Sequence, residues 1–229
     1  MDLSIVQNHT FLTLLGGGSV TSAELAKAMR FAPILVAADG GAHFAISEGI
    51  VPEAVIGDFD SLADRARSAI PRERFHQVDE QDTTDFEKCL ARIRAPLILG
   101  VGLTGKRRDH ELAAYHALMR NPAQRCLLIA EEDIILLCPP RMSIDLPRGT
   151  RVSLFPMAPV NVSSTGLEWE LSELALEPGR RIGTSNAALG GLVELSVNKP
   201  NLLVILPVDK LSELIAALEV NSGQWPPQT

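Results

Sequence analysis

Short apolar runs alternate with amphipathic segments through the first half of the chain. Apolar runs that predict strands lie at residues 11–15, 33–38, 54–56, 75–78, 96–101 and 124–130. Segments with helical periodicity and helix-start residues lie between them, at 21–30, 42–48, 62–70, 83–94 and 110–120. This alternation is typical of a parallel sheet with helices on both faces. We therefore expect an α/β fold whose N-terminal part is an open, mostly parallel sheet flanked by helices.

The pattern changes after about residue 133, where prolines become frequent and long helical stretches rare. Residues 192–197 alternate between apolar and polar as in a half-buried strand, and residues 202–206 form an apolar run. The turn residues between them predict a hairpin. We expect a small antiparallel β-sandwich domain here, followed by a helix over 210–220 and a loose tail. The predicted domains are therefore residues 1–135 and 136–229.

Composition narrows the class of protein. The chain has 229 residues, of which 46% are hydrophobic and 21% charged, as in ordinary globular proteins. A net charge of −7 with no basic block disfavours a nucleic-acid or anionic-membrane partner. The three cysteines are too scattered for a disulfide framework, and Cys89 and Cys126 fit buried thiols. With no signal-peptide pattern and no apolar run long enough to span a bilayer, we expect a cytoplasmic protein.

Acidic residues gather where the predicted strands end. They are Asp39, Asp58, Asp60, Asp82, Asp85 and Asp109. The carboxyl ends of parallel strands share one edge of a sheet, where ligands bind. So many carboxylates at one edge would repel each other unless a cation lay among them. Mg²⁺ suits such a site because it takes a few carboxylates together with water and substrate phosphates. The alternative is local: Asp58 or Asp60, and Asp82 with Asp85, can cap the helices that follow.

A glycine-rich loop follows the strand predicted at 96–101. Residues 100–106 satisfy the spacing of a P-loop, but Arg107 stands where a P-loop needs a hydroxyl to bind magnesium. The glycines still allow phosphate to approach the backbone, and Arg107 suits a fork contact to phosphate oxygens. A plain glycine turn with solvated basic residues remains the alternative. No G-x-S-x-G elbow or dinucleotide-binding glycine pattern is present, which disfavours covalent catalysis and an NAD site.

Several short motifs follow one another in a fixed order. They lie at residues 38–42, 56–61, 81–88, 102–105 with Arg107 and 109–110, 152–156, 164–169 and 184–186. Together they resemble the thiamine pyrophosphokinase family over roughly residues 10–206. Two departures stand out, since Glu80 replaces the first aspartate of the family's Asp-Gln-Asp and Lys106 replaces the second glycine of its Gly-Gly-Arg.

The resemblance implies an activity and an architecture. It implies transfer of the pyrophosphoryl group of ATP to the hydroxyethyl oxygen of thiamine, which gives thiamine diphosphate and AMP. It further implies Mg²⁺, a nucleotide-binding α/β domain, and a β-sandwich domain for thiamine binding and dimerisation. The expected assembly is a homodimer with active sites between its subunits. Transfer of this kind asks mainly for alignment and charge neutralisation, so the absence of a nucleophile motif agrees with it.

The resemblance also implies a role for each motif residue. The expected metal ligands are Asp39, Asp58, Asp60 and Asp85. The residues expected at ATP are Asp39, Gln81, Asp82, Thr84, Lys88, Gly102, Thr104 and Gly105. The reacting groups would be handled by Asp85, Asp109 and Arg107, and thiamine would be seated by Ser185 and Asn186, with Trp169 a weaker candidate. The sequence does not choose between Asp85 and Asp109 as the group that takes the hydroxyl proton.

Other functions stay open at this point. The same chemistry could act on another hydroxymethyl acceptor such as a pterin. A non-catalytic nucleotide-binding or thiamine-binding regulator could share the scaffold, although the acidic residues are all retained. A P-loop ATPase that uses Lys106 would need the hydroxyl that is absent at position 107.

Overall fold

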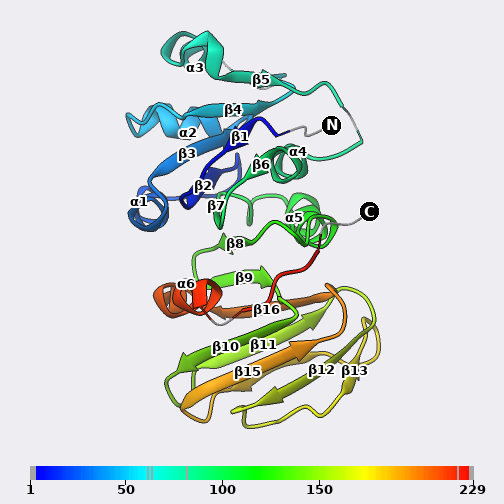
Figure 1. The fold of residues 1–229 in the computed structure, drawn as a ribbon. Helices are drawn as coiled ribbons and strands as arrows, with labels where there is room; N and C mark the ends of the chain where they lie inside the picture. Colours follow the sequence, from blue (N-terminus) through cyan, green and yellow to red (C-terminus); the bar gives the residue numbers. More distant parts are fainter. Residues whose placement is uncertain (1–3, 61, 63, 81, 221, 227–229) are drawn as a thin grey trace. The chain divides into compact units, whose positions relative to one another are not determined.

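The computed structural model describes residues 4–60, 62, 64–80, 82–220 and 222–226. The chain consists of two compact units, Met1–Ala130 and Glu131–Thr229, and Figure 1 shows the elements of each. The first unit contains a parallel sheet. Its strands are β2 (Leu12–Leu15), β3 (Ile34–Ala38), β4 (Ala54–Gly57), β5 (Phe75–Gln77), β7 (Ile98–Val101) and β8 (Cys126–Ile129). They lie in the order β8-β7-β2-β3-β4-β5 and every pairing is parallel.

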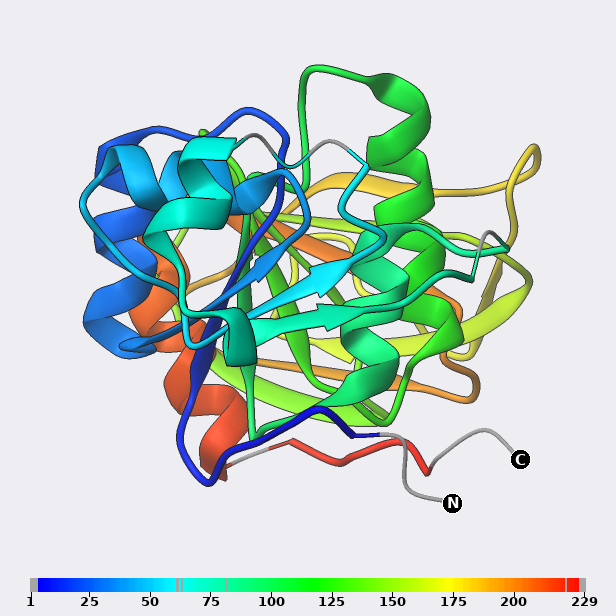
Figure 2. The same ribbon diagram turned by 90° about the horizontal axis from the view of Figure 1, so that it is seen from above.

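Helices cover both faces of this sheet. They are α1 (Ser22–Phe31), α2 (Gly41–Ser47), α3 (Asp64–Ala69), α4 (Asp85–Arg92) and α5 (Arg108–Arg120), with a 3-10 turn at Arg72–Arg74. In Figure 2, α1 and α2 (blue) lie on one side of the strands of this unit and α4 and α5 (green) on the other. Thr21, rather than Ser22, caps α1, and it does so in a capping box with Glu24. Strands that are buried on both faces explain why each reads as a continuous apolar run.

The second unit is built from two antiparallel sheets. One contains β14 (Gly183–Ala187), β11 (Arg151–Pro156), β16 (Leu202–Pro207) and β9 (Asp133–Leu137), in that order. The other contains β10 (Arg141–Leu146), β15 (Gly191–Val197), β12 (Val160–Thr165) and β13 (Leu174–Leu176), in that order. A 3-10 turn at Val208–Lys210 leads into α6 (Leu211–Val220), which packs on β10. The predicted fold class is confirmed in both parts.

Some local predictions were wrong. The expected hairpin does not form, because β15 pairs with β10 and β12 whereas β16 pairs with β11 and β9. The turn between them therefore carries the chain from one sheet to the other. The tail was expected to be loose, yet the Trp225 indole Nε1 donates to the Cys138 carbonyl at 2.8 Å and the Gly223 backbone N–H donates to the Arg141 carbonyl at 2.8 Å.

The helix expected at 83–94 is also shorter in the structure. Thr84 caps α4, because its hydroxyl accepts from the Glu87 backbone N–H at 3.3 Å, so Asp82 is not the cap. The last two residues of the expected helix form β6 (Ile93–Arg94), which pairs in parallel with β1 (Val6–Gln7). Isoleucine suits this pairing because a β-branched side chain packs well on a strand.

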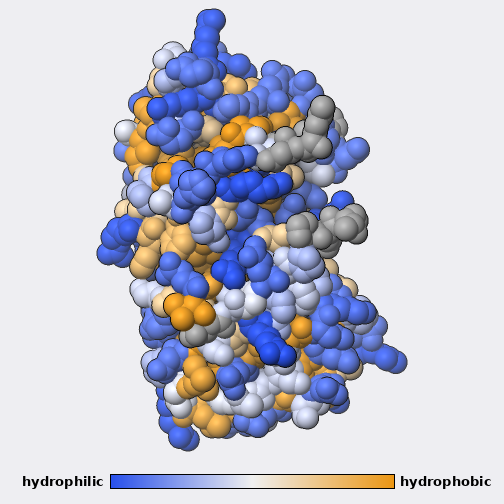
Figure 3. Space-filling model, viewed as in Figure 1, coloured by the Kyte–Doolittle hydropathy of each residue, from blue (hydrophilic) through white to orange (hydrophobic). Residues whose placement is uncertain are grey.

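Burial and surface agree with the composition. The three cysteines are free and buried, which confirms the prediction for Cys89 and Cys126. Hydrophilic and hydrophobic residues are interspersed over the face drawn in Figure 3. Among the described residues, none of the helices has the length and apolar character needed to cross a membrane.

Candidate active site

The carboxyl ends of the first unit's parallel strands surround a pocket of about 400 Å³. Its walls come from the turns after β2, β3, β4 and β7 and from the start of α4. The residues that line it include Gly16–Gly18, Asp39, Asp58, Thr84, Asp85, Lys88, Gly102, Gly105, Lys106 and Arg107. Ligands of open parallel sheets bind at this edge, so this pocket is the candidate active site.

Asp39 lies at the end of β3 and is only 5% exposed. Its backbone has φ of 35°, a left-handed conformation that aspartate tolerates better than most residues. Gly57, at the end of β4, makes room for it: a Cβ atom at residue 57 would lie 2.7 Å from the Asp39 Cβ. The glycine before Asp58 therefore allows the ends of two neighbouring strands to place their carboxylates in one pocket.

Lys88 lies between two of the predicted acidic ligands. Its Nζ donates to Asp58 Oδ2 at 3.2 Å and to Asp85 Oδ1 at 3.1 Å. Its side chain is 2% exposed, compared with 21% for Asp58 and 34% for Asp85. Burial alone would lower the pKa of Lys88, but the hydrogen bonds and charges of Asp85 and Asp58 outweigh burial and raise it. Lys88 is therefore a charged group inside the acidic cluster.

The pKa values of the two carboxylates are shifted in opposite directions. The Asp60 backbone N–H, which donates to Asp58 Oδ1 at 3.3 Å, and the Lys88 ammonium keep the pKa of Asp58 below its ordinary value. Burial raises the pKa of Asp85, and the charges of Asp39 and Asp58 add to that rise against the opposing effect of Lys88. Carboxylate repulsion thus persists with the lysine in place, which means that the cluster can accept further positive charge.

The donor set fits Mg²⁺ in its chemistry. Asp39, Asp58 and Asp85 offer hard carboxylate oxygens in a pocket that glycine turns also line, and Mg²⁺ usually takes only one or two carboxylates plus substrate phosphates. Within the described parts of the chain, no three His, Cys, Asp or Glu side chains are grouped closely enough to hold a metal by themselves. A divalent cation held here would therefore need phosphate oxygens in addition to these carboxylates.

The loop after β7 contains three residues in the left-handed backbone region. Gly102, Gly105 and Lys106 have φ of 66°, 72° and 53°, which is the left-handed region. For a lysine this conformation costs on the order of 1 kcal/mol. Its Nζ donates to the Gly17 carbonyl at 3.2 Å, so it ties this loop to the turn after β2.

Glu111 on α5 holds the loop after β7 through a hydrogen bond to its backbone. Its carboxylate accepts from the Gly105 backbone N–H at 3.3 Å, from Arg108 at 2.9 Å and from the Tyr115 hydroxyl at 2.8 Å. These hydrogen bonds oppose the effect of burial, which is the largest single influence, and leave the pKa of Glu111 lowered. Sequence reasoning missed Glu111, although its four-residue spacing from Tyr115 on a helix was a usable signal.

Arg107 and Asp109 form a forked pair at the start of α5. The guanidinium Nε and Nη2 donate to Oδ1 and Oδ2 of Asp109, and the two side chains are 67% and 63% exposed. The hydrogen bond to Arg107 is the main reason that the pKa of Asp109 is lowered. Arg107 lines the pocket, whereas Asp109 is not among its lining residues.

Other predicted residues lie away from the pocket wall. Asp60 and Asp82 are exposed and Thr104 is buried, and none of the three is among the lining residues. Gln81 lies outside the residues that the structure describes. The pocket thus brings together a large part of the predicted set, namely Asp39, Asp58, Thr84, Asp85, Lys88, Gly102, Gly105 and Arg107.

The residues expected at thiamine belong to the second unit. Asn186 is buried and holds the backbone of Trp169, since its Oδ1 accepts from the Trp169 N–H at 3.1 Å and its Nδ2 donates to the Trp169 carbonyl at 2.7 Å. Trp169 is 60% exposed. Ser185 is exposed with φ of 60°, and its backbone N–H donates to Ser153 Oγ at 3.0 Å. Asn186 therefore fixes the backbone of Trp169, whose side chain remains exposed.

Comparison with known proteins matches each unit to a family model. Residues 25–129 match the model described as "Thiamin pyrophosphokinase, catalytic domain", and residues 140–202 match "Thiamin pyrophosphokinase, vitamin B1 binding domain". Thiamine pyrophosphokinase 2 of Arabidopsis thaliana is 30% identical over 198 residues, which is 69% of this chain and 74% of the plant protein. Thiamine pyrophosphokinase of Bacillus subtilis (strain 168) is 27% identical over 187 residues, or 76% and 87% of the two chains.

Solved structures agree on the fold. Yeast thiamin pyrophosphokinase superposes with a TM-score of 0.73 at 16% identity, covering 91% of this chain and 90% of the yeast chain. At this low identity the superposition demonstrates a shared fold alone. The evidence for the family comes from the sequence matches to the two family models and to the plant relative.

Proposed function

Because the chain belongs to the thiamine pyrophosphokinase family, we propose that it transfers the pyrophosphoryl group of ATP to the hydroxyethyl oxygen of thiamine. The observation that carries this proposal is the pocket at the carboxyl edge of the parallel sheet. Three aspartates line it from the ends of β3 and β4 and the start of α4, and Lys106 and Arg107 line it from the loop after β7, which β2 separates from β3 in the sheet. An acidic wall that faces a basic loop suits a triphosphate bound together with a cation.

The reaction follows from its products. The thiamine hydroxyl oxygen attacks the β-phosphorus of ATP, and the bond from that phosphorus to the α–β bridging oxygen breaks. AMP leaves, and the hydroxyl proton passes to a carboxylate. The protein's part is to hold donor and acceptor in line and to stabilise charge on the transferred group. The Gly102–Lys106 segment can place backbone N–H groups at the phosphates, and Arg107 can make a forked contact to their oxygens.

The acidic wall would hold the metal. Asp39, Asp58 and Asp85 are the proposed protein ligands of Mg²⁺, with phosphate oxygens completing the shell. When bound, Mg²⁺ neutralises charge on the triphosphate during transfer. Asp60 stays a predicted ligand, although its exposed side chain lies outside the residues that line the pocket. Lys88 would keep Asp58 and Asp85 in position through its hydrogen bonds to both.

Asp85 is better placed than Asp109 to take the proton. It stands in the pocket wall, whereas both oxygens of Asp109 accept from Arg107 in an exposed pair. Asp109 is better suited to orient Arg107. This assignment rests on position, and an Asp109→Asn variant should therefore keep more activity than an Asp85→Asn variant.

Thiamine would bind through the second unit. The exposed indole of Trp169 can cover an apolar or cationic ring, and the cationic thiazolium favours contact with an aromatic face. Ser185 would contribute its exposed hydroxyl and Asn186 would position Trp169. A homodimer with active sites between subunits is proposed from the resemblance. The cytoplasmic location expected in the sequence analysis stays a proposal.

One assay tests the function directly. Incubation with ATP, Mg²⁺ and thiamine should yield AMP and thiamine diphosphate in equal amounts. Release of ADP, or no turnover at all, would contradict the proposal. Faster turnover of a hydroxymethyl pterin than of thiamine would mean that the acceptor is a pterin and not thiamine. Binding of nucleotide and thiamine without any transfer would favour a regulator.

A further inference from the structure

The loop between β4 and α3 brings Asp58 to the active-site pocket. The structure describes residues 58–60 and 62 of this loop. Asp58 lines the pocket, whereas the next residue, Phe59, is only 8% exposed and belongs to a buried hydrophobic cluster of the first unit. Neighbouring residues of one loop thus serve the pocket and the core. The placement of the Asp58 carboxylate therefore depends on how firmly the loop is held.

Phe59 has an unfavourable backbone conformation. Its φ is 65°, in the left-handed region, which is uncommon for a bulky residue and persists only where the surroundings fix it. The Phe59 ring packs edge-on against the ring of Phe75 on β5, with 5.4 Å between the ring centroids and an interplanar angle of 83°. This packing supplies one of the constraints that hold the loop.

Arg67 on α3 supplies a second constraint. Its Nη2 donates to the Phe59 carbonyl at 2.8 Å, and its Nε donates to the Leu62 carbonyl at 3.1 Å. Two donors of one planar guanidinium therefore hold two carbonyls of the same loop, and both hydrogen bonds are charge-assisted. The Leu62 backbone N–H also donates to the Phe59 carbonyl, at 3.3 Å. Arg67 thus ties the segment that follows Asp58 to α3.

The charge of Arg67 is not used to neutralise the acidic cluster. Both of its hydrogen bonds go to neutral carbonyls, and it forms no ion pair with the acidic residues in the part of the chain that the structure describes. Lys88 differs in this respect, because its ammonium contacts the Asp58 carboxylate itself. Arg67 can therefore fix the backbone beside Asp58 and leave the carboxylate available to a cation.

We propose that Arg67 is a positioning residue for the metal ligand Asp58, and that it acts through the backbone of Phe59 and Leu62. The inference rests on the proposed function, which assigns Mg²⁺ to the acidic wall of the pocket. A carboxylate that is already held in place loses less freedom when a cation binds, so the affinity for the cation is higher. Loss of Arg67 should weaken the binding of Mg²⁺ and slow transfer, with KM for thiamine unchanged.

Calorimetric titration of the full chain with inorganic triphosphate, once in Mg²⁺ and once in EDTA, isolates the contribution of the metal. Arg67→Gln should weaken triphosphate about fivefold or more in Mg²⁺, because two charge-assisted hydrogen bonds are lost, and should leave its affinity in EDTA unchanged. Arg67→Lys keeps the charge but not the planar fork, so its affinity in Mg²⁺ should be intermediate.

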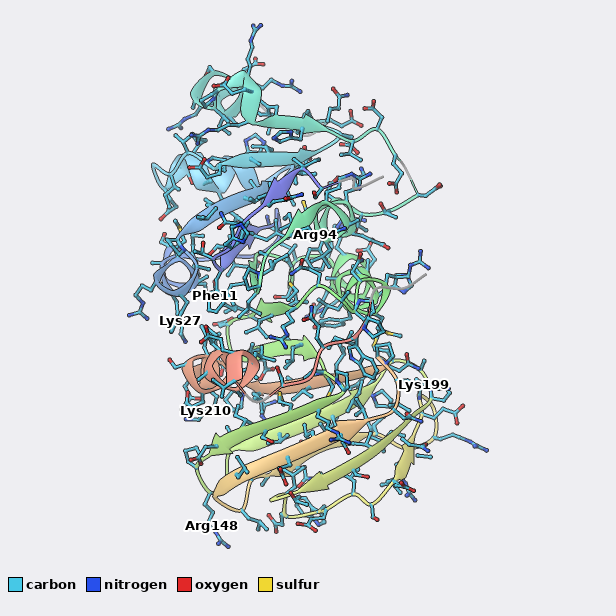
Figure 4. The ribbon with its side chains drawn as sticks, in the orientation of Figure 1. Phe11, Lys27, Arg94, Arg148, Lys199 and Lys210 are labelled. Carbon is cyan, nitrogen blue, oxygen red and sulfur yellow. The ribbon has the colours of Figure 1, made fainter. Side chains whose placement is uncertain are left out.

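Two variants serve as controls. Arg65→Gln removes the same charge from an exposed position on the same helix, and should keep both affinities within about twofold of the wild type. Lys199→Gln removes a charge from the second unit, where Figure 4 labels this exposed lysine in the turn after β15, and should behave in the same way. Phe59→Leu removes the ring contact without a change of charge, and should reproduce the selective loss in Mg²⁺.

The outcomes separate this inference from the proposed function. An Arg67→Gln protein with the affinity of the wild type in Mg²⁺ would overturn the positioning role. Equal weakening in Mg²⁺ and in EDTA would also overturn it, because that result indicates a general structural effect. If Arg67→Gln does not fold, Phe59→Leu decides by the same two measurements. A wild-type chain that shows the selective effect of Mg²⁺ but makes no thiamine diphosphate would refute the proposed function and leave the role of Arg67 intact.

Discussion

Replacement of Lys88 by methionine tests the electrostatics of the acidic cluster most directly. Methionine nearly matches the length of the lysine stem and fills the same buried space, so the main change is loss of the ammonium. Asp58 and Asp85 would then lose their shared partner, which now lies 3.2 Å and 3.1 Å from their oxygens. We expect the variant to fold but to be less stable when no divalent cation is present.

The magnitude follows from the geometry. At these distances and an effective dielectric constant near 20, each contact is worth about 5 kcal/mol of attraction before the cost of desolvation. Removal of one partner from a buried ion pair typically costs about 3–5 kcal/mol. Asp58 and Asp85 keep 21% and 34% of their side-chain surface, so water solvates them in part. The low end, about 3 kcal/mol, is therefore appropriate, which corresponds to a fall in Tm of roughly 10 °C.

Thermal unfolding with EDTA and with Mg²⁺ provides the assay. In EDTA the variant should melt well below the wild type, and Mg²⁺ should restore much of the difference because a divalent ion can compensate the same carboxylates. Lys199→Met is the matched control, since it removes an exposed lysine and should leave Tm within about 2 °C. A Lys88→Met protein that melts with the wild type in EDTA, or that gains no more from Mg²⁺ than the wild type does, would refute the reasoning.

Three further predictions address other parts of the molecule. Asp58→Asn should reduce kcat by about a hundredfold or more, as expected for loss of a group that stabilises the transition state, and Asp60→Asn should reduce kcat less. Parallel steady-state assays with varied Mg²⁺ compare the two variants, and equal losses of kcat would mean that Asp60 is a ligand of the same rank as Asp58. Glu111→Gln should raise KM for ATP several-fold and leave KM for thiamine unchanged, because the Gly105 N–H loses a charged acceptor worth about 1.5–3 kcal/mol. A raised KM for thiamine instead would contradict the role of Glu111 in holding the loop after β7. Native protein should resist thiol reagents at pH 8 and react with all three thiols in denaturant, because burial raises the pKa of each cysteine; rapid labelling of native protein would disprove that burial.

The α/β part of the fold could be predicted because its strands are buried on both faces. Runs such as Ile34–Ala38 and Ile98–Val101 are apolar throughout, and the helices between them carry their own start signals, such as the Thr21–Glu24 capping box. Local information was sufficient there. The β unit was harder, since the partner of a strand depends on contacts distant in sequence. The turn at 198–201 looks like a hairpin locally, yet it joins strands of two sheets.

The candidate site shows the same division between local and distant information. Asp39, Asp58 and Asp85 could be placed at one edge of the sheet because each follows a recognisable strand or opens a helix. The role of Lys88 could not be assigned from sequence, because its contact with Asp58 spans thirty residues. Its spacing from Asp85 allowed a pair with that residue, and the resemblance placed it at ATP, but neither indicated a contact with Asp58. The structure shows instead a buried lysine that bridges two elements.

The acidic and the basic residues of the pocket come from different elements, and this separation favours one orientation of a bound triphosphate. The acidic groups come from the ends of β3 and β4 and the start of α4, whereas Lys106 and Arg107 come from the loop after β7. A bare triphosphate would be repelled by the acidic wall and attracted by the loop. A triphosphate that carries a divalent cation can satisfy both sides at once, but only with the cation turned toward the aspartates. The pocket should therefore discriminate by orientation as well as by affinity, and Lys88 sustains this by keeping the acidic wall assembled before the nucleotide arrives.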